Sequence, residues 1–544
     1  MTVRDLPGQE RSSNGSEDAE DANDSSPPPA EHSLEIELKL AGTFDTLENL
    51  WKSTIAPRAK TVSRHLISSY FDTEDLRLRR RGFTLRVRQD GDGFVQTVKA
   101  EKGSTQGVMR RGEWTTPIDG PTPDLARLGD PKVREKIGLI VPGELQPIFT
   151  TDVTRHIKKY RINRKGTEKA SIEAALDRGE IRCNGVIEPI SEIELELLQG
   201  SHITLQREAA RLHKKLALQF QPLSKAERGF ALGLGERPRG EKANPPKLKS
   251  DTSVEESLER IMANCVSHWL ANHAAVLDGG DIEGVHQMRV ALRRMRSALT
   301  IFKDVLPADD LAWLQREAKS LIGALGTARD WDVFDDELLR PVLNAHPEDA
   351  KLKILQEAVN EERRLAYEHA RATLGSPAYL RFILELGAWL EDRGWRRAET
   401  QNGLDKDLIN LADEVLRKRH KQVMKLGRNF DDLADEALHE LRISLKKLRY
   451  ATEFFGSLYG RSRTKAYLKS LRQLQDDLGH LNDVAVAESR LADLCGSIAS
   501  DHTGALQMAS GTVIGWYSHA LAQVRPRIAK DWYAFTEAEN FWKH

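Results

Sequence analysis

Three charged residues near the N-terminus have types and a spacing that could bind ions. Within residues 33–40, Glu35, Glu37 and Lys39 alternate with aliphatic residues. Strict alternation predicts a β-strand with one charged and one apolar face. Neighbouring carboxylates on one face repel each other, so water or a cation must offset their charge. A strand face in contact with solvent and a cation-binding face are both open interpretations at this point.

Later segments repeat this separation of charged and aliphatic faces, which indicates a shared arrangement of several strands. The repeated charged faces comprise Arg86 and Arg88; Arg111 and Glu113; Arg155, Lys159 and Arg161; and Glu192, Glu194 and Glu196. Two arrangements fit: a small barrel with an apolar interior and charges in solvent, or an inside-out barrel whose charges line a water-filled tunnel. The tunnel is favoured, because charges of both signs suit an anion together with a divalent cation, and predicted helices can cover the apolar faces.

The types of charged residue indicate which ligands a tunnel would take. Arg forks onto phosphate oxygens and Lys offers a compact charge, so several of them together suit a polyanion. Carboxylates without His or Cys suit a hard cation, Mg²⁺ or Mn²⁺, which binds one or two carboxylates together with substrate phosphates. The pattern therefore indicates a site for a phosphate compound and a divalent metal.

The elements that must carry these residues are predicted mainly as strands between residues 33 and 235. After the first strand, further strands are expected at 62–71, 83–88, 94–99, 109–116, 148–162, 170–176, 180–183 and 190–198. We interpret Asp177-Arg178-Gly179 as a turn between two of these strands, and residues 222–229 as a loop. Helices are expected at 44–55 and 202–218.

Composition and charge predict a soluble protein with more than one domain. The chain has 544 residues, of which 30% are charged and 40% hydrophobic, and this length exceeds that of a single core. With 81 basic and 82 acidic residues, the net charge indicates no polyanionic partner, and only local clusters can do so. Three widely separated cysteines and the lack of a long apolar run predict a reducing cytoplasm and no membrane span.

Shifts in composition and periodicity divide the chain into four segments. We expect a disordered acidic tail at 1–32, the strand-rich domain at 33–235, a Pro/Gly/Lys linker at 236–253 and an all-helical domain at 254–544. The helical domain contains an internal repeat, because residues 285–296 match residues 438–449 at an offset of 153 residues. We expect two similar bundles, at about 254–400 and 401–544, packed together.

Each repeat carries a basic stripe at helical spacing. The first stripe holds His286, Arg289, Arg293 and Arg296, and the second holds His439, Arg442, Lys446 and Arg449. Residues at i, i+3, i+7 and i+10 lie on one side of a helix, apart from the apolar stripe that faces the core. A solvated basic face would explain one copy, but recurrence in both copies favours an external anion. The two histidines are interpreted equally well as anion contacts or as packed core residues.

The strand-rich half resembles the CYTH family, the triphosphate tunnel metalloenzymes. The resemblance rests on the ExExK motif Glu35-x-Glu37-x-Lys39, on the later basic strands, on Asp177 and on the closing strand with its alternating glutamates, and it covers roughly residues 33–235. It implies an eight-stranded antiparallel tunnel that binds triphosphate compounds together with a divalent metal. Members of the family include inorganic, thiamine and RNA triphosphatases and class IV adenylate cyclases.

The resemblance also implies roles for individual residues. Glu35, Glu37 and Lys39 are expected to act in catalysis. The expected metal ligands are Glu35, Glu37, Asp177, Glu192 and Glu194, with Glu196 as a further inward-facing carboxylate. The expected phosphate contacts are Lys39, Arg86, Arg88, Lys99, Arg111, Arg155, Arg161 and Lys225. Glu113 and Glu173 are additional acidic candidates.

The helical half, from about residue 254 to 544, resembles the CHAD family, a helical domain named for its histidines. The resemblance rests on two copies of a His-x-x-Arg-x-x-x-Arg/Lys-x-x-Arg helix. It implies that both stripes bind inorganic polyphosphate, with Arg316, Lys319, Lys469 and Arg472 as further contacts. Nucleic acid, the competing polyanion, is disfavoured, because aromatic residues for base stacking are not interleaved with the basic residues, apart from Tyr450 beside Arg449.

The two resemblances together predict metal-dependent hydrolysis of inorganic tripolyphosphate to pyrophosphate and phosphate by a cytoplasmic protein associated with polyphosphate granules. Metal and basic residues would neutralise the phosphate charge while a water oriented by a carboxylate attacks the terminal phosphorus. Two alternatives are a non-catalytic polyphosphate-binding protein and a hydrolase or cyclase for an organic triphosphate. We find no motif for purine recognition, which argues against the cyclase.

Overall fold

The structure is a computed structural model that describes residues 31–91, 93–100, 104–105, 108–138, 140, 143–163, 169–216, 218–397, 403–497 and 503–542. Most of the expected acidic tail, residues 1–30, lies outside this part of the chain. Residues 31 and 32 belong to the first strand, which begins at Glu31, and not to the predicted tail.

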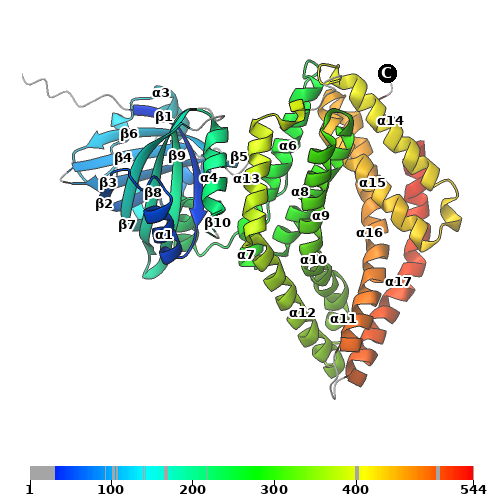
Figure 1. Ribbon diagram of the computed structural model, residues 1–544. Coiled ribbons are helices and arrows are strands. Elements are labelled where there is room, and N and C mark those ends of the chain that lie inside the picture. Colours follow the sequence, from blue (N-terminus) through cyan, green and yellow to red (C-terminus); the bar gives the residue numbers. More distant parts are fainter. Residues whose placement is uncertain are drawn as a thin grey trace, which may run out of the picture.

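Eight antiparallel strands form a closed barrel, on the left in Figure 1, and confirm the predicted α+β architecture of this half. Their order around the barrel is β1-β9-β8-β7-β2-β3-β4-β6, and β6 closes the ring by pairing with β1. The bounds are β1 Glu31–Ala41, β2 Val62–Thr73, β3 Phe83–Asp90, β4 Gly93–Ala100, β6 Val108–Ile118, β7 Leu145–Ile162, β8 Ala170–Cys183 and β9 Val186–Gln199. Two short strands extend it, β5 (Ser104–Thr105) beside β6 and β10 (Gln219–Phe220) beside β1.

The first strand shows that the barrel is inside out. Its aliphatic residues Ile36, Leu38 and Leu40 point outward and join a buried core with the helices that lie against the outside of the barrel. Its charged residues point inward, where Glu37 is 2% and Lys39 is 4% exposed. The alternative arrangement, with charged faces in solvent, is therefore wrong. The helices of this half are α1 Phe44–Ser53, α2 Arg77–Arg80, η1 Leu125–Arg127, α3 Pro131–Ile137, α4 His202–His213 and α5 Lys225–Leu234.

Strand β8 differs from the sequence prediction, because it runs unbroken through the expected turn at 177–179. Asp177 lies in the middle of this strand with its side chain fully buried. Because Gly179 has no side chain, strand β7 can pack closely against it. A Cβ atom at this position would lie 2.0 Å from the carbonyl oxygen of Asp152. The glycine therefore marks a close contact between two strands rather than a change of chain direction.

The predicted loop at 222–229 is also wrong, because helix α5 begins at Lys225. Ser224 caps this helix: its hydroxyl accepts a hydrogen bond from the Glu227 backbone N–H, and the Glu227 carboxylate accepts one from the Ser224 N–H. Such a reciprocal capping box satisfies two backbone donors that the start of a helix leaves without intrahelical partners. The cap fixes the position of Lys225, the first residue of the helix.

The second half is helical and lies beside the barrel (Figure 1). Its α-helices are α6 Val254–Ala271, α7 His273–Asp278, α8 Ile282–Ile301, α9 Ala308–Ala324, α10 Gly326–Val333, α11 Arg340–Ala345, α12 Ala350–Leu374, α13 Pro377–Glu391, α14 Leu408–Leu426, α15 Asp435–Phe455, α16 Arg461–Ser497 and α17 Thr503–Glu537. A π-helical segment, η3 (Phe334–Leu339), joins α10 to α11, and four short 3₁₀ turns are η2 Lys303–Val305, η4 Gly394–Arg397, η5 Phe430–Asp432 and η6 Gly456–Leu458.

The helices repeat at the same offset as the sequence motif. Helices α8, α9 and α12 begin at residues 282, 308 and 350, and α15, α16 and α17 begin at 435, 461 and 503, each 153 residues later. The long helix α16 corresponds to the series from α9 to α11, which η3 interrupts in the first repeat. Figure 1 shows the first repeat next to the barrel and the second farther from it.

The two halves share a buried interface. No helix or strand lies between Leu234 and Val254, and this connecting segment packs onto the helical half, where Leu248 is buried and Gly240 donates its N–H to Asp281. Helix α4 of the first half packs on α13 of the second, and Arg207 forms an ion pair with Asp392 at 2.9 Å across it. Across the described ranges, none of the helices is long and apolar enough to cross a membrane.

Candidate active site

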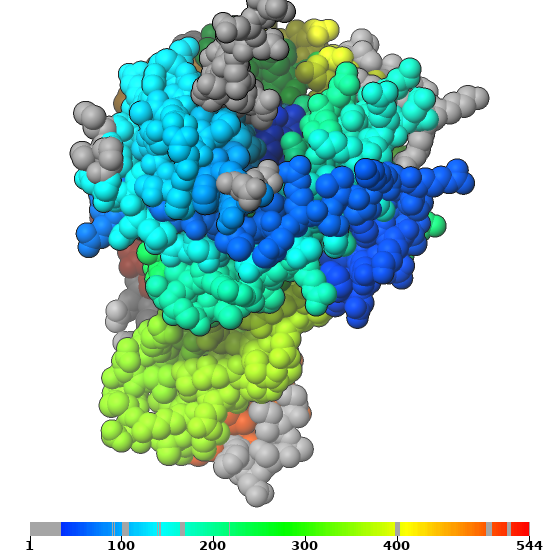
Figure 2. Space-filling model, turned by 90° about the vertical axis from the view of Figure 1, so that its left-hand side faces the viewer, coloured from blue at the N-terminus to red at the C-terminus, as the bar shows by residue number. Residues whose placement is uncertain are grey.

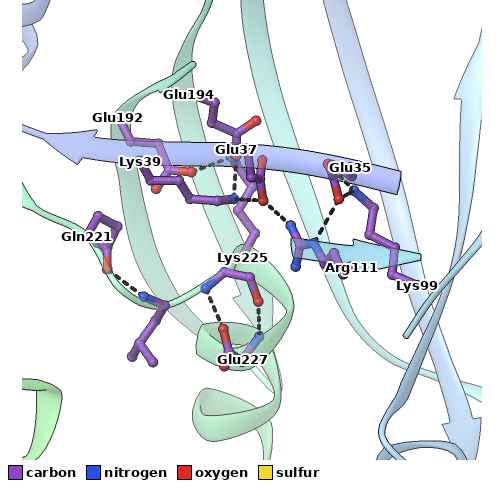
Figure 3. A network of polar contacts seen from close by, with 12 residues as sticks. Glu35, Glu37, Lys39, Lys99, Arg111, Glu192, Glu194, Gln221, Lys225 and Glu227 are labelled. Atoms are coloured by element: carbon purple, nitrogen blue, oxygen red, sulfur yellow. Dashed lines mark hydrogen bonds and ion pairs between the residues drawn. The ribbon is translucent and has the colours of Figure 1, made fainter. Parts of the chain in front are cut away.

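A charged cavity of about 330 Å³ lies inside the barrel. Figure 2 looks onto the barrel and shows its surface hollowed between the light-blue and the blue-green segments. All eight barrel strands and the start of α5 contribute to the lining, and Figure 3 shows part of it at close range. Its expected lining residues are Glu35, Glu37, Lys39, Arg86, Arg88, Lys99, Arg111, Glu113, Arg155, Glu173, Asp177, Glu194, Glu196 and Lys225.

The three residues of the ExExK motif pair with charges on both neighbouring strands. Lys39 lies opposite Glu194 in the β1–β9 register, and its Nζ donates to Glu194 Oε1 at 2.6 Å. Glu35 lies opposite Arg111 in the β1–β6 register, and Arg111 Nε donates to it at 2.8 Å. Arg111 also reaches Glu37, so the guanidinium bridges the two carboxylates (Figure 3). The alternation of β1 thus places all three side chains in the cavity.

One end of this charge system is a compact acidic cluster of Asp177, Glu192 and Glu194. One carboxylate oxygen from each residue lies within 4.8 Å of the other two, and all three side chains are buried. The register explains their meeting, because Asp177 on β8 is directly opposite Glu192 on β9, with Glu194 two residues further on the same face. This cluster does not include Glu35 or Glu37, which pair mainly with cations at the other side of β1.

Two members of the acidic cluster, Glu194 and Asp177, stay ionised because cations surround them. Burial would raise the pKa of Glu194, but the charges of Lys225, Lys39 and Arg155 outweigh it and hold that pKa well below its usual value. Asp177 follows the same pattern. Burial raises its pKa, but the charges of Lys225 and Arg155 outweigh burial, so the pKa of Asp177 lies below its usual value. Arg155 clasps Asp177 with two parallel hydrogen bonds of 2.7 and 2.6 Å. Such bidentate pairing is the strongest form of Arg–carboxylate contact.

Arg86 and Arg88 form a basic group with spare hydrogen-bonding capacity. Within the described ranges, Arg88 contacts no carboxylate and donates to the Ser68 hydroxyl at 3.2 Å. Burial, and then the positive charges of Arg86 and Arg155, lower the pKa of Arg88 to about 9. In the described part of the chain, Arg86 has one distant carboxylate, Glu113 at 3.8 Å, and its buried Nε has no hydrogen-bond partner. An anion in the cavity would satisfy these donors.

Glu196 behaves differently from the other carboxylates of the cavity. It lies opposite Glu173 on β8 and opposite Glu37 on β1. Burial, and then the negative charges of Glu35 and Glu173, raise the pKa of Glu196 to about 7. The prediction that its side chain faces the cavity agrees with the geometry, and the carboxyl group is poised to change charge near neutral pH.

The structure places one expected phosphate contact outside the cavity. Arg161 has the same strand parity as Arg155, but it lies six residues further along β7, where its side chain is exposed. It does not line the cavity. The alternation of residues predicts which face of a strand a side chain lies on, but not how far along the strand the cavity extends. Arg161 is therefore not part of the site described by the structure.

Sequence reasoning missed several residues that complete the site. Arg228, on α5, donates to Glu192 at 3.2 Å and to Glu188 at 2.6 Å. Its position on a helix was not predicted, because residues 222–229 were interpreted as a loop. The capping-box pattern Ser224-x-x-Glu227 was the available signal. Uncharged polar lining residues were also missed, because nothing in the alternation singles them out; they are Ser68, Tyr70, Thr84, Thr97, Thr115, Thr151 and Ser224.

In the helical half, the basic stripes of the two repeats approach each other. Arg293 on α8 donates from Nε to the Tyr450 hydroxyl on α15 at 3.4 Å. Burial, and then the positive charges of Arg442 and Arg293, lower the pKa of Lys446 to about 7. Burial, and then Arg329 and Arg293, lower the pKa of His286 to about 3. Residues from both stripes thus form one basic cluster, which consists of His286, Arg289, Arg293, Arg442, Lys446 and Arg449.

This basic cluster is only partly neutralised. Three of its guanidinium Nε atoms, in Arg289, Arg442 and Arg449, are buried without a hydrogen-bond partner among the described residues. The acidic neighbours are distant: Asp483 lies 3.6 Å from Arg442, and Glu453 lies 3.6 Å from Arg449. Buried donors of this kind cost stability unless an external acceptor satisfies them.

Six other residues that were expected to bind polyphosphate lie at the edge of the basic cluster or outside it. Arg296 donates to Gln315 at 2.9 Å, and His439 is exposed and bonded to Asn482 at 2.7 Å. The four weaker candidates are exposed, and they are Arg316, Lys319, Lys469 and Arg472. The two equivalent histidines therefore differ, since His286 is half-buried among cations and His439 is at the surface.

A closed antiparallel barrel with a charged interior, followed by a helical repeat domain with a central basic cluster, defines a two-domain protein. Comparison with family models agrees with this division: residues 33–230 match the model described as CYTH domain, and residues 260–492 match the one described as CHAD domain. The chain therefore consists of a CYTH domain followed by a CHAD domain.

Similar proteins match either most of this chain or one part of it. An uncharacterized protein of Mycobacterium tuberculosis (strain CDC 1551 / Oshkosh) is 27% identical over 490 residues, which cover 85% of this chain and 90% of that protein. An inorganic triphosphatase of Haemophilus influenzae is 32% identical over 204 residues, which cover 37% of this chain and 55% of the enzyme. The crystal structure of the CHAD domain from the plant Ricinus communis is 32% identical with a TM-score of 0.46, covering 53% of this chain and 96% of that one.

Proposed function

We propose that this protein hydrolyses inorganic tripolyphosphate to pyrophosphate and phosphate in the barrel cavity, and that the basic cluster of its helical domain binds inorganic polyphosphate. The observation that carries the first part is the pairing of two opposite sites in one cavity. The acidic cluster offers oxygen ligands for a cation, and Arg86 and Arg88 offer spare donors for an anion. The similarity to an inorganic triphosphatase supports the same reaction.

The donor set of the acidic cluster fits a hard divalent cation. Its ligands are three buried carboxylates with neither His nor Cys among them, which suits Mg²⁺ or Mn²⁺ rather than zinc. Asp177, Glu192 and Glu194 would hold such an ion, and Glu35 and Glu37 lie on the neighbouring strand face. When bound, it would neutralise phosphate charge and so favour attack by water.

The remaining residues have roles that follow from their positions. Arg86 and Arg88 bind the terminal phosphoryl oxygens, because their donors have the fewest protein partners. Lys39, Lys99, Arg111 and Arg155 hold the carboxylates in place and share their charge with the bound anion. A carboxylate of the ExExK motif orients the attacking water. The oxygen of this water bonds to the terminal phosphorus as the bond from that phosphorus to the bridging oxygen breaks, and pyrophosphate leaves.

The lining of the cavity favours an inorganic substrate over a nucleotide. Tyr70 is the single aromatic residue among its described lining residues. Its ring already stacks on Phe149, with ring centroids 4.4 Å apart. A purine would therefore have at most the second face of this one ring to stack on, whereas the many charged groups suit bare phosphates.

Phosphate release from a panel of tripolyphosphate, thiamine triphosphate, ATP and long-chain polyphosphate tests the reaction. We expect the fastest release from tripolyphosphate, dependent on Mg²⁺ or Mn²⁺ and lost in excess chelator. Asp177→Asn removes one charge from the acidic cluster and should lower kcat/KM at least 100-fold. Glu180→Gln is the matched control, since Glu180 lies on the same strand but outside the cavity. Tight tripolyphosphate binding without product would favour the non-catalytic alternative.

The proposal for the helical domain rests on the basic cluster between the repeats. Three of its buried Nε donors lack partners among the described residues, and the two stripes contribute from helices α8 and α15, so a chain of phosphates between them would contact both. Salt-dependent binding of fluorescent polyphosphate to the full-length protein tests this. Arg293→Ala should weaken binding at least tenfold and leave tripolyphosphate hydrolysis unchanged. Arg364→Ala, at an exposed ion pair on α12, should leave both unchanged; equal binding by both variants would contradict the proposal.

A further inference from the structure

Lys225 holds a position among the carboxylates that the other cations of the cavity do not share. Its Nζ lies 2.7 Å from Asp177 Oδ2 and 2.9 Å from Glu194 Oε1, and it also contacts Glu192 Oε1. Within the described ranges it is the one basic side chain that contacts all three members of the acidic cluster. Arg155 contacts two of them, and Lys39 and Arg228 contact one each.

We propose that Lys225 is a built-in counter-cation of the acidic cluster, which a divalent metal must displace in order to bind. The inference rests on the proposed metal site. The ammonium already contacts one oxygen of each of the three carboxylates that the metal would need as ligands. A divalent ion held by the same three oxygens would lie within contact distance of the ammonium, where two positive charges in a buried site repel strongly.

The position of Lys225 in the fold allows such a movement. The backbone is held by the capping box at the start of α5, but the side chain ends in a flexible four-carbon stem that lines the cavity. Released from the carboxylates, the ammonium can turn into the cavity and meet an anion there. Metal and phosphate anion then favour each other's binding, because the anion takes over the charge that the metal displaces.

The displacement predicts that removal of the ammonium tightens metal binding. Mn²⁺ binding to the full-length protein, without any phosphate, is measured by the electron paramagnetic resonance signal of free Mn²⁺. Lys225→Met should bind Mn²⁺ at least tenfold more tightly than the wild type, and Lys225→Gln should behave alike. Lys99→Met is the matched control: it removes another cavity ammonium, whose partners Glu35 and Glu113 are outside the acidic cluster. Its Mn²⁺ affinity should change less than threefold.

Thermal unfolding shows whether the variants fold and gives a second readout. Mn²⁺ should raise the Tm of Lys225→Met more than that of the wild type, since the variant leaves three carboxylates short of a cation. Unchanged or weaker Mn²⁺ affinity in both Lys225 variants would overturn the inference, and so would equal tightening in Lys99→Met. If the Lys225 variants fail this test but the wild type hydrolyses tripolyphosphate with Mn²⁺, the proposed function still stands. If the Lys225 variants bind Mn²⁺ more tightly but the wild type does not hydrolyse tripolyphosphate, only the proposed function is contradicted.

Discussion

Lys39 and Glu194 lie directly opposite each other where the first strand of the barrel meets the last, with Nζ and Oε1 2.6 Å apart. Both side chains are almost fully buried, and Glu194 also contacts Arg155 and Lys225. Burying charges costs free energy that only close pairing offsets. The ExExK motif and the closing strand of glutamates are therefore two parts of one structure, a buried arrangement of alternating charges that lines the cavity.

Loss of the Glu194 charge should weaken both the fold and the reaction. Glu194→Gln keeps the shape of the side chain but leaves Lys39, Arg155 and Lys225 with less countercharge. Removing one partner of a buried ion pair typically costs about 3–5 kcal/mol. We expect a fall in the free energy of unfolding of that order, measured by urea denaturation, and loss of tripolyphosphate hydrolysis. A variant as stable as the wild type would contradict the buried pairing; Glu180→Gln is again the control.

The raised pKa of Glu196 predicts that the difference in unfolding free energy between the wild type and Glu196→Gln depends on pH. The folded state keeps this carboxyl protonated up to about pH 7, whereas the unfolded chain releases the proton near its ordinary value of 4.5. The folded state thus binds more protons between these values, so the contribution of Glu196 to stability is full below pH 4.5 and is lost as the pH rises to 7. Above pH 7 the ionised group is a constant cost.

Glu196→Gln removes this dependence and isolates it from other groups. Buried histidines such as His268 and His273, whose pKa burial lowers to about 4, change stability in the opposite direction over the same range. The difference in unfolding free energy between variant and wild type should therefore favour the variant increasingly from pH 4.5 to 7, and stay constant above it. A difference that does not vary with pH would refute the assignment.

Lys446 should show a conflict between stability and binding. Burial and the nearby arginines lower its pKa to about 7, so at neutral pH its charge costs folding free energy. Lys446→Met removes this cost and should raise the Tm by several degrees, while weakening polyphosphate binding at least fivefold. Lys447→Met, at the exposed neighbouring position, should change neither. A lower Tm for Lys446→Met would show that the cluster is not strained by its own charge.

Gly179 provides a test of the barrel itself. A Cβ atom at this position would meet the Asp152 carbonyl oxygen at 2.0 Å, so Gly179→Ala must push β7 and β8 apart. We expect a loss of about 3 kcal/mol in unfolding free energy, at the upper end of the usual cost of overpacking. Gly511→Ala, in helix α17 with open space around it, should instead add up to about 1 kcal/mol. Similar effects of both substitutions would contradict the close strand contact.

The sequence allowed the face of each strand to be predicted better than the extent of each element. Alternation placed Glu35, Glu37 and Lys39 on one face, and the aliphatic partners of that strand explain why the charges point inward. Depth along a strand has no such signal, which is why Arg161 was expected in the cavity and is instead exposed. Asp177-Arg178-Gly179 resembles a turn in composition, but tertiary contact with β7 keeps it extended.

Relations between distant residues were the least predictable part. The two basic stripes were recognisable one by one, but their approach depends on how α8 packs against α15, which local periodicity does not contain. The place of Lys225 at the centre of the acidic cluster required α5 to be known as a helix. The capping box at Ser224 and Glu227 could have revealed it, and a loop assignment concealed it.

The most direct test of the account is phosphate release from tripolyphosphate by the purified full-length protein and its Arg88→Met variant. Arg88 is the cavity guanidinium that the protein leaves free of carboxylates in its described part, so we assign it to the substrate anion. The account predicts Mg²⁺- or Mn²⁺-dependent release of one phosphate per tripolyphosphate, with a KM at least tenfold higher in the variant. Release that persists in excess chelator, or an Arg88→Met variant with wild-type kinetics, would contradict it.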